Sequence, residues 1–518
     1  MLIAIVIGYL IFTVMIGVYA SSRVHGAKDF MVAGRSLPLY MTFTCVFATW
    51  FGAETVLSVS ATFARDGLVA IPGDPFGFSM CLVMVAVFFA RAFYRMDLLT
   101  IGDFYKKRFG KSVELFTSIA ITLSYLGWTA AQLTALGLVL LVLGQGAGFD
   151  WLSLNMCILA GAVIVMFYTD LGGMWSVALT DMIQTFVIII GLVIVAFVLA
   201  QLVETSGPAA ADTGAAAGGL SLAAGGVRRV ISHASEAGRL QLFPTEGLVA
   251  WIPYIAGFLT AALGSIPQQD VFQRVTSARD EKTAVRGTLL GGAFYFVFAF
   301  VPMFIAYSAV VLDENYLQLF SSDDERLVQR ILPELVMAKT PLWVQAIFLG
   351  ALLSAILSTA SGTLLAPSSL FTENVLRPLF PSVNEKNMLR ILRIVLVIFA
   401  SAATWQAVSS NKTMYQMVQA AYSVTLVGAL VPLALGIYWK GATTQGAILS
   451  ITAGMGVWAG CLYGFGDEAL VPPQLYGLVA SLLGMIVGSL APQMLRDMRS
   501  HRPEDQPLPE AETSGADG

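Results

Sequence analysis

The chain has 518 residues, of which 57% are hydrophobic and only 12% are charged, and its mean hydropathy is +0.76. Because soluble domains carry roughly 25% charged residues, this composition excludes a soluble protein and predicts one that crosses a membrane many times. The lack of a long basic run excludes a nucleic-acid-binding protein, whereas the net charge of −4 says little because most charges sit in loops.

Thirteen apolar runs are long enough to cross a bilayer as helices. The first run resembles a signal peptide, but it has no basic leading region and is predicted to remain as an uncleaved helix over 1–21. Two of the runs exceed the length a bilayer requires and are predicted to be tilted, kinked or extended beyond it. The runs are 2–21, 38–64, 75–95, 113–144, 150–168, 176–203, 247–266, 286–311, 341–367, 387–409, 413–438, 443–463 and 471–491.

Cysteine and histidine lie where they support neither a metal site nor catalysis. The four cysteines fall in apolar runs, which predicts buried free thiols rather than a disulfide framework. The three histidines fall in predicted loops, and no paired carboxylates stand beside the membrane. We therefore predict no enzyme activity and no cofactor. The residues are Cys45, Cys81, Cys157, Cys461, His25, His233 and His501.

The basic residues predict the orientation of the chain. Twenty-one of the 29 lysines and arginines fall in loops on one side, including Arg274 in the loop after the seventh run, and none falls in the middle of a run. By the positive-inside rule this side is cytoplasmic, so the N-terminus is outside the cell and the C-terminus inside. The Ala/Gly-rich outer loop 204–246 is predicted to be flexible, loop 312–340 to contain a short helix, and tail 492–518 to be disordered.

Two runs carry polar and helix-breaking residues in or near the membrane. Segment Ala48–Ser58 places a Gly, a Glu, two Thr and a Ser within one span, and Gly264–Arg274 places a Gly, a Pro and the adjacent pair Gln268 and Gln269 at the end of another. Each segment opens a set of five spans, and paired broken helices at matching places are typical of secondary transporters with inverted repeats. Alternatively, Gly264 and Pro267 simply end the seventh span.

A third polar group lies in the ninth run, where Ser and Thr crowd the segment Ser354–Asn374. Adjacent hydroxyls at Ser358 and Thr359 could face the break in the second span and, with freed carbonyls, bind a hard cation such as Na⁺. The alternative is that these hydroxyls bond the preceding turn or hold helices together.

The chain resembles the sodium:solute symporter family, which includes bacterial proline, pantothenate and sialic-acid carriers and animal glucose and choline carriers. The resemblance covers the chain from near the N-terminus to about residue 440. The motifs that carry it are DFMVAGRSLPLY (Asp29–Tyr40), ATWFGAETVLS (Ala48–Ser58) with DGL (Asp66–Leu68), TIGDFYKKRFG (Thr100–Gly110), YTDLGGMWSVALTDMIQ (Tyr168–Gln184), GSIPQQDVFQR (Gly264–Arg274) and SAILSTASGTLLAPSS (Ser354–Ser369).

This resemblance implies an all-α polytopic membrane protein with two inverted five-helix repeats, whose first and sixth core helices are broken. The repeats correspond to 38–203 and 247–438, with one extra helix before them and two after them at 443–491. It also implies Na⁺-coupled alternating access, with a release route for the ion along Asp181. The implied Na⁺ ligands are the carbonyls of Ala48, Phe51 and Ala355 and the hydroxyls of Ser358 and Thr359.

The solute site implied by the resemblance lies between the two broken helices and the span that carries Trp128. Choline carriers of the family have tryptophans at the positions of Trp50 and Trp128, but they have a third where this chain has Gln268, which argues against choline. Both tryptophans could instead be packing residues. The candidate solute contacts are Trp50, Gly52, Glu54, Trp128, Gln132, Gln268 and Gln269.

Glu54 has no predicted basic partner inside the membrane. An anionic solute beside it would be repelled at low dielectric, whereas a cationic or zwitterionic amine would be attracted. Alternatively, Glu54 is protonated and donates a hydrogen bond, or lies hydrated near an outer vestibule.

The function predicted is therefore Na⁺-driven symport of a small organic solute, with an amine-bearing or neutral polar compound favoured. A solute sensor of the same fold and an H⁺-coupled carrier that uses Glu54 are the alternatives. The predicted location is the cell membrane, and the partners are Na⁺, the solute and lipid, with the chain a monomer or a loose oligomer.

Overall fold

The computed structural model of the chain describes residues 1–21, 27–169, 173–206, 219–313, 315–316, 328–466 and 469–494. Within these ranges the regular structure is helical, and the one β-type contact is an isolated parallel bridge between Leu37 and Ala278. The predicted all-α class is therefore confirmed. The tail that was predicted to be disordered lies outside the described residues from position 495 on, as do His25 and His501.

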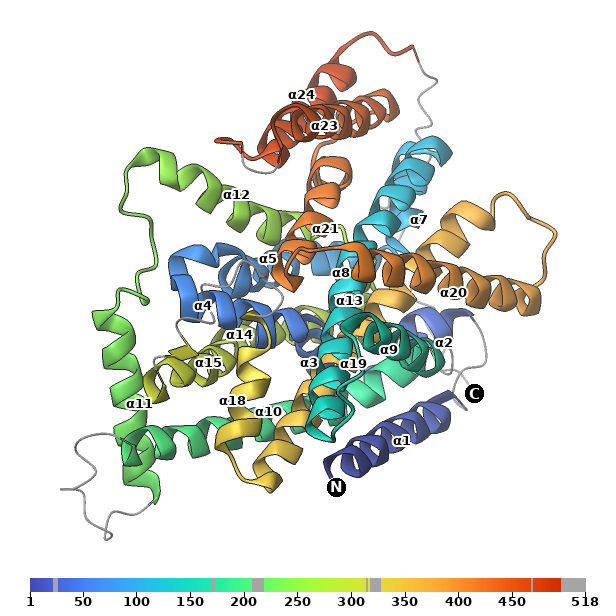
Figure 1. The fold of residues 1–518 in the computed structure, drawn as a ribbon. Coiled ribbons are helices and arrows are strands. Elements are labelled where there is room, and N and C mark those ends of the chain that lie inside the picture. The colour runs from blue at the N-terminus through green and yellow to red at the C-terminus, as the bar shows by residue number, and fades with distance from the viewer. Residues whose placement is uncertain are drawn as a thin grey trace, which may run out of the picture.

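The predicted spans correspond to the long helices of the structure (Figure 1). Among the described residues, nine helical segments are long and apolar enough to cross a membrane, and three bent pairs bring the number to twelve. The thirteenth predicted span is a shorter apolar helix, α9. The unbroken spans are α1 (Leu2–Ser21), α8 (Lys111–Gly146), α9 (Leu154–Thr169), α10 (Gly173–Thr205), α14 with α15 (Glu281–Phe298 and Phe300–Leu312), α19 (Leu342–Phe371), α20 (Glu385–Ser409), α23 (Thr444–Phe465) and α24 (Pro473–Leu490).

The span 72–95 is helical but irregular, and the backbone at Asp74 is not helical (φ −130°, ψ 120°). It begins with a π-helical turn, η4 (Pro72–Gly77), and continues through α5 (Phe78–Met84), η5 (Val85–Phe89) and α6 (Ala90–Arg95). Two prolines in η4 explain the irregular start, since neither can donate a backbone hydrogen bond.

Three spans are sharply bent. Helix α3 (Leu39–Trp50) turns by 55° into η2 (Glu54–Val59) and α4 (Ser60–Asp66), and α12 (Leu248–Gly264) turns by 46° into α13 (Gln269–Thr276). These two breaks lie where the sequence predicted them. The third bend, of 44° between α21 (Met414–Gly428) and α22 (Leu430–Tyr438), was not predicted. Pro432 is its local cause, because it has no N–H for the Gly428 carbonyl.

Helices α8 and α19 lie at the centre of the molecule (Figure 1). Helix α19 packs against both α8 and α10, while α8 also contacts α9, α20 and α21. Helix α3 packs against α10 and α14 and also touches α19. The first broken helix is therefore held against the helix that carries Ser358 and Thr359.

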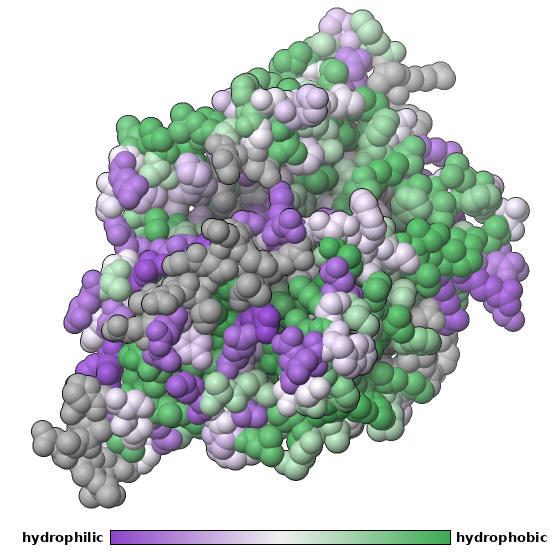
Figure 2. Space-filling model, viewed as in Figure 1, coloured by the Kyte–Doolittle hydropathy of each residue, from purple (hydrophilic) through white to green (hydrophobic). Residues whose placement is uncertain are grey.

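The outer helices present apolar surfaces. Helix α1 and the pair α23–α24 lie at opposite edges of the bundle, and most of their side chains face outward (Figure 1). Broad hydrophobic areas cover the surface over α20 and α24 (Figure 2), where exposed side chains include Ile394, Ile398, Leu483 and Val487. Broad apolar surfaces of this kind are favourable in contact with lipid and unfavourable in contact with water.

The prediction that segment 204–246 is flexible was wrong for part of it. Residues 207–218 lie outside the described part, but Gly219–Glu236 form an amphipathic helix, α11, that packs on α10. A Cβ at Gly226 would lie 1.8 Å from the Ala200 carbonyl oxygen, so the small residues that suggested flexibility instead permit close helix packing. The predicted external helix in 312–340 corresponds to α18 (Ile331–Lys339).

The closeness of the second break to α21 is testable at Gly264. A Cβ there would lie 2.4 Å from the Tyr422 carbonyl oxygen, and backbone cannot rotate away as a side chain can. We expect Gly264→Ala to destabilise the protein by about 1–3 kcal/mol and to lower its melting temperature in detergent. Gly456→Ala is the control, because no atom lies within 4 Å of a Cβ at that position. Equal melting temperatures for the two variants would contradict this packing.

Candidate ion and solute sites

The break after α3 frees backbone groups at the centre of the bundle. Because α3 ends at Trp50, the carbonyls of Ala48 and Thr49 lose the N–H partners that a continuous helix would supply. The N–H of Ala53, which would have bonded to Thr49, donates instead to Oε1 of Gln132 at 3.2 Å. An unwound segment inside a membrane needs such substitutes, because lipid offers none.

Helix α19 supplies the partners for the freed carbonyls. The Ser358 hydroxyl donates to the Ala48 carbonyl at 2.7 Å, and the Thr359 hydroxyl lies 3.3 Å from that oxygen and 3.2 Å from the Thr49 carbonyl. Both side chains are fully buried. The remaining Na⁺ ligands predicted from the resemblance are backbone carbonyls on the same two segments, at Phe51 and Ala355.

Asp181, expected along the ion-release route, lies on α10 beside these hydroxyls. Its carboxyl is fully buried next to the Ser358 hydroxyl and the Cys45 thiol. Neither neighbour reaches hydrogen-bonding geometry, since Ser358 donates to Ala48, and both carboxyl oxygens are without a hydrogen-bond partner among the described residues. A buried carboxyl in this condition is a strong acceptor for a cation.

The expectation that Arg274 lies in a cytoplasmic loop was wrong. It lies in α13, is only 2% exposed, and donates from Nε to the Thr49 hydroxyl at 2.9 Å. Its charge faces the carboxyls of Asp181 and Asp270. The error arose at Pro267, which was read as the end of the span, whereas the chain continues as α13 within the bundle.

Glu54 occupies the first turn of η2 and is 1% exposed. Its carboxylate accepts a hydrogen bond from the Trp128 indole N–H at 3.0 Å and one from the Gln132 amide at 2.5 Å. No Lys or Arg of the described part forms an ion pair with it. Glu54 is therefore solvated by neutral donors alone.

Aromatic rings cluster around Trp128, the hydrogen-bond partner of Glu54. Trp50 stacks on Tyr422 with centroids 6.3 Å apart, contacts Phe78 edge-on at 5.3 Å and lies 6.1 Å from Trp128. The Tyr422 hydroxyl is buried and has no hydrogen-bond partner among the described residues. The predicted solute contacts Trp50, Glu54, Trp128 and Gln132 are thus brought together at this aromatic cluster, with Gly52 at the break.

A second buried carboxyl, Asp74, was not identified from the sequence. It accepts hydrogen bonds from the hydroxyls of Thr55 at 2.8 Å and Tyr295 at 2.6 Å, and it interacts electrostatically with Glu54. The predicted apolar run began at residue 75, which left Asp74 just outside the span. The signal available was an acid followed by Pro75 at the start of a span.

The two glutamines of the second break bond elsewhere. The Gln268 side chain interacts with the hydroxyls of Ser124 and Thr425 at 3.1 and 3.2 Å. Gln269 accepts from the backbone N–H of Ile101 at 2.8 Å, at the start of α7 (Ile101–Phe109), and its amide nitrogen has no described partner. Neither one hydrogen-bonds to Glu54 in this structure.

Comparison with known proteins relates this arrangement to a family. The model of the sodium:solute symporter family matches residues 30–454. The chain belongs to this family. It is accordingly a Na⁺-coupled solute symporter of the membrane and not an enzyme, which favours symport over the sensor and H⁺-carrier alternatives.

Individual relatives of the symporter carry different solutes. The human high affinity choline transporter 1 is 26% identical over 88% of this chain and 75% of its own length. The zebrafish (Danio rerio) sodium/glucose cotransporter 4 is 22% identical over 88% and 70%. A substrate-bound, outward-open Na⁺-coupled sialic acid symporter shares the fold, with a TM-score of 0.74 and 19% identity over 94% of this chain and 97% of that one.

The buried position of Arg274 is testable by substitution. We expect Arg274→Met to cost about 3–5 kcal/mol of stability, because Asp181 and Asp270 lose their counter-charge inside the bundle. Adding Asp270→Asn should restore part of the loss. Thermal unfolding in detergent measures both effects. The control is Arg279→Met, whose exposed pair with Asp280 should leave the melting temperature unchanged; an equal loss in the control would contradict the assignment.

Proposed function

We propose that this symporter carries a small solute with a cationic amine, and that Glu54 is the contact for its charge. The observation that carries the proposal is the state of Glu54: fully buried, bonded to the neutral donors Trp128 and Gln132, and without a basic partner in the described part. An ammonium group beside it would form a charge-assisted hydrogen bond. An anionic solute would meet repulsion in a medium of low dielectric.

The aromatic cluster favours the same class of solute. Trp50, Trp128 and Tyr422 present ring faces and edges within about 6 Å of one another, and such rings attract a desolvated organic cation by up to about 2 kcal/mol. Asp74 adds a second carboxyl close enough to interact with Glu54. Two carboxyls and several rings suit an amine better than a sugar or a carboxylate.

The relatives support this class without naming the solute. The choline transporters carry an organic cation by name, whereas the glucose cotransporter and the sialic acid symporter do not. Gln268, where choline carriers have a third tryptophan, bonds to Ser124 and Thr425 in a polar setting. We therefore propose an amine with its own hydrogen-bonding groups rather than choline.

For the coupling ion we propose a Na⁺ site between the first break and α19. The support is that the Ser358 and Thr359 hydroxyls already converge on carbonyls freed by the break. Hydroxyl and carbonyl oxygens are the donors that hard cations prefer. The full proposed set is Ala48, Phe51, Ala355, Ser358 and Thr359, with Asp181 on the release route.

We further propose that Na⁺ favours the outward-open state and that the solute then closes it, so that the two sites are coupled through one conformational equilibrium. In this scheme the repeats are 38–203 and 247–438. The N-terminus is outside and the C-terminus cytoplasmic in the cell membrane, as the basic loops indicate. The chain acts as a monomer or a loose oligomer.

A thermal-shift screen with and without Na⁺ tests the solute class. Amine-bearing compounds should raise the melting temperature, since a ligand at a hundred times its Kd adds about 2.7 kcal/mol to stability. Sugars and carboxylates should not. Glu54→Gln should abolish the amine shift, whereas Glu281→Gln, at a surface ion pair, should preserve it. A Na⁺-dependent shift by a carboxylate, with amines inactive, would refute the proposal.

The Na⁺ site is tested by the double variant Ser358→Ala with Thr359→Ala. Removing both hydroxyls should raise the Na⁺ concentration for half-maximal uptake by at least about tenfold, since two weak ligands of roughly 1 kcal/mol each are lost. Uptake by proteoliposomes over a Na⁺ series gives this value. Ser368→Ala is the matched control on the same helix, because its hydroxyl bonds only the preceding turn. Wild-type Na⁺ dependence of uptake by the double variant would contradict the proposed Na⁺ site.

A further inference from the structure

Helix α1, which precedes the two repeats, turns one narrow stripe of side chains toward the bundle. Most of the helix faces outward, but Val6, Tyr9, Thr13 and Gly17 recur every three or four residues on the side that packs against α10 and α19. The Thr13 hydroxyl donates to the Tyr9 carbonyl of its own helix at 2.9 Å. The Tyr9 hydroxyl is therefore the polar group of this stripe that reaches another helix.

The Tyr9 hydroxyl forms a hydrogen bond with the hydroxyl of Ser354 on α19. Ser354 is fully buried and donates its own proton to the Gly350 carbonyl at 2.7 Å. Because a hydroxyl has one proton to donate, Tyr9 is the donor and Ser354 the acceptor in the bond between them. This bond joins the first helix of the chain to the central helix that carries Ser358 and Thr359.

Ser354 begins the turn of α19 that is proposed to bind Na⁺. Positions four apart lie on one face of a helix, so Ser354 and Ser358 stand one turn apart, with Ala355 between them in the chain. Ser358 in turn donates to the Ala48 carbonyl at 2.7 Å. A shift of the turn at Ser354 would therefore move the Ala355 carbonyl and the Ser358 hydroxyl together.

Gln184 of α10 also lies beside Tyr9. Its side chain is 1% exposed, and both amide atoms lack a hydrogen-bond partner among the described residues. Gln184 follows Asp181 by three positions, so these two unpartnered side chains share a face of α10. The Tyr9 hydroxyl thus lies where α1, α10 and α19 meet, next to the two turns that carry the proposed ion ligands and the release route.

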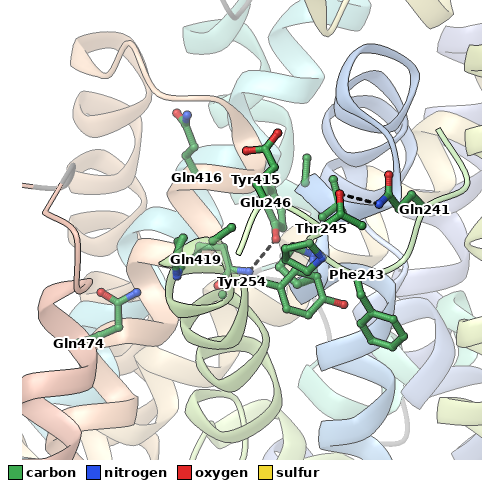
Figure 3. Close-up of a pocket in the computed structure, with 16 residues that line it drawn as sticks. Gln241, Phe243, Thr245, Glu246, Tyr254, Tyr415, Gln416, Gln419 and Gln474 are labelled. Atoms are coloured by element: carbon green, nitrogen blue, oxygen red, sulfur yellow. Dashed lines mark hydrogen bonds between the residues drawn. The ribbon is translucent and has the colours of Figure 1, made fainter. Parts of the chain in front are cut away.

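This contact lies away from the cavity shown in Figure 3. That cavity, of about 540 Å³, is lined by segment 69–72, by the loop that enters α12, and by residues of α12, α21 and α24. None of its lining residues belongs to α1, α10 or α19. A substitution at Tyr9 therefore leaves this cavity unchanged, and an effect on Na⁺ has to pass through α10 or α19.

We propose that Tyr9 is a positioning residue of the ion site, whose hydroxyl fixes the turn from Ser354 to Ser358 so that Ala355 and Ser358 meet the break after α3. The inference rests on the Na⁺ site proposed above and adds to it a helix outside the proposed set of ligands. The affinity of a site for a cation depends on how rigidly its ligands are held. A turn released by the loss of the Tyr9 hydroxyl therefore binds Na⁺ more weakly.

The test is uptake by proteoliposomes over a Na⁺ series with Tyr9→Phe, which keeps the ring and removes the hydroxyl. We expect the Na⁺ concentration for half-maximal uptake to rise about fivefold, the equivalent of one hydrogen bond of about 1 kcal/mol. Uptake at saturating Na⁺ should stay at the wild-type level, because no ligand is lost. An unchanged half-maximal concentration overturns the proposal.

Two controls separate positioning from packing. Val6→Ala shortens a buried side chain of the same stripe, so it should lower the melting temperature and leave the half-maximal Na⁺ concentration unchanged. Tyr463→Phe, at a side chain that is 97% exposed on α23, should change neither. A shift in Na⁺ dependence for Val6→Ala equal to that for Tyr9→Phe would mean that loosened packing is sufficient, which overturns the proposal.

Ser354→Ala tests the same bond from the other helix. Adding Tyr9→Phe to it should leave the half-maximal Na⁺ concentration where Ser354→Ala alone puts it, because the bond can be lost only once; effects that multiply overturn the proposal. Ser358→Ala with Thr359→Ala reports separately on the ion site. If that variant is shifted and Tyr9→Phe is not, the positioning role alone fails, whereas wild-type Na⁺ dependence in that variant overturns the site and the positioning role together.

Discussion

A helix that unwinds inside a membrane must find partners for the backbone groups it frees, because the hydrocarbon provides none. The centre of this symporter is built around that requirement. The carbonyls of Ala48 and Thr49 meet hydroxyls from α19, and the N–H of Ala53 meets the side chain of Gln132 on α8. These partners are neutral, so they form hydrogen bonds with the freed backbone groups without placing a charged side chain at the break. Its oxygens remain able to take up a cation.

Charge is distributed unequally on the two sides of the break. Beside η2, the carboxyl groups of Glu54 and Asp74 are bonded by neutral donors. Beside α13, Arg274 interacts electrostatically with the carboxyl groups of both Asp181 and Asp270. Each side therefore holds more carboxyl groups than cationic side chains. The proposed amine and Na⁺ would each add a positive charge beside such carboxyl groups.

The sequence predicted the parts of this fold that depend on composition and on helix-breaking residues. The spans follow from apolar length, and the first two breaks follow from Gly52, Gly264 and Pro267. Features that depend on the path of the chain in space were missed. Arg274 was assigned to a loop because hydropathy does not reveal that a broken helix continues beyond the break. Helix α11 was missed because the small residues that permit close helix packing resemble those of a flexible linker. The proposed site residues themselves came from family resemblance, since hydroxyls in a span have several common roles.

The spacing of groups along the break explains how ion and solute could be coupled over a short distance. In the proposed scheme Ala48 and Phe51 contribute to the ion site, whereas Trp50 and Glu54 belong to the aromatic cluster, so the two sets alternate within about two turns of one segment. A change in the geometry of the break must therefore alter both sites together. Coupling of this kind needs no extended pathway, because a single two-state element is shared by both ligands. The Asp181 carboxyl lies beside Ser358 and has no hydrogen-bond partner among the described residues, so in the proposed scheme it would be the next ligand on the release route of the ion.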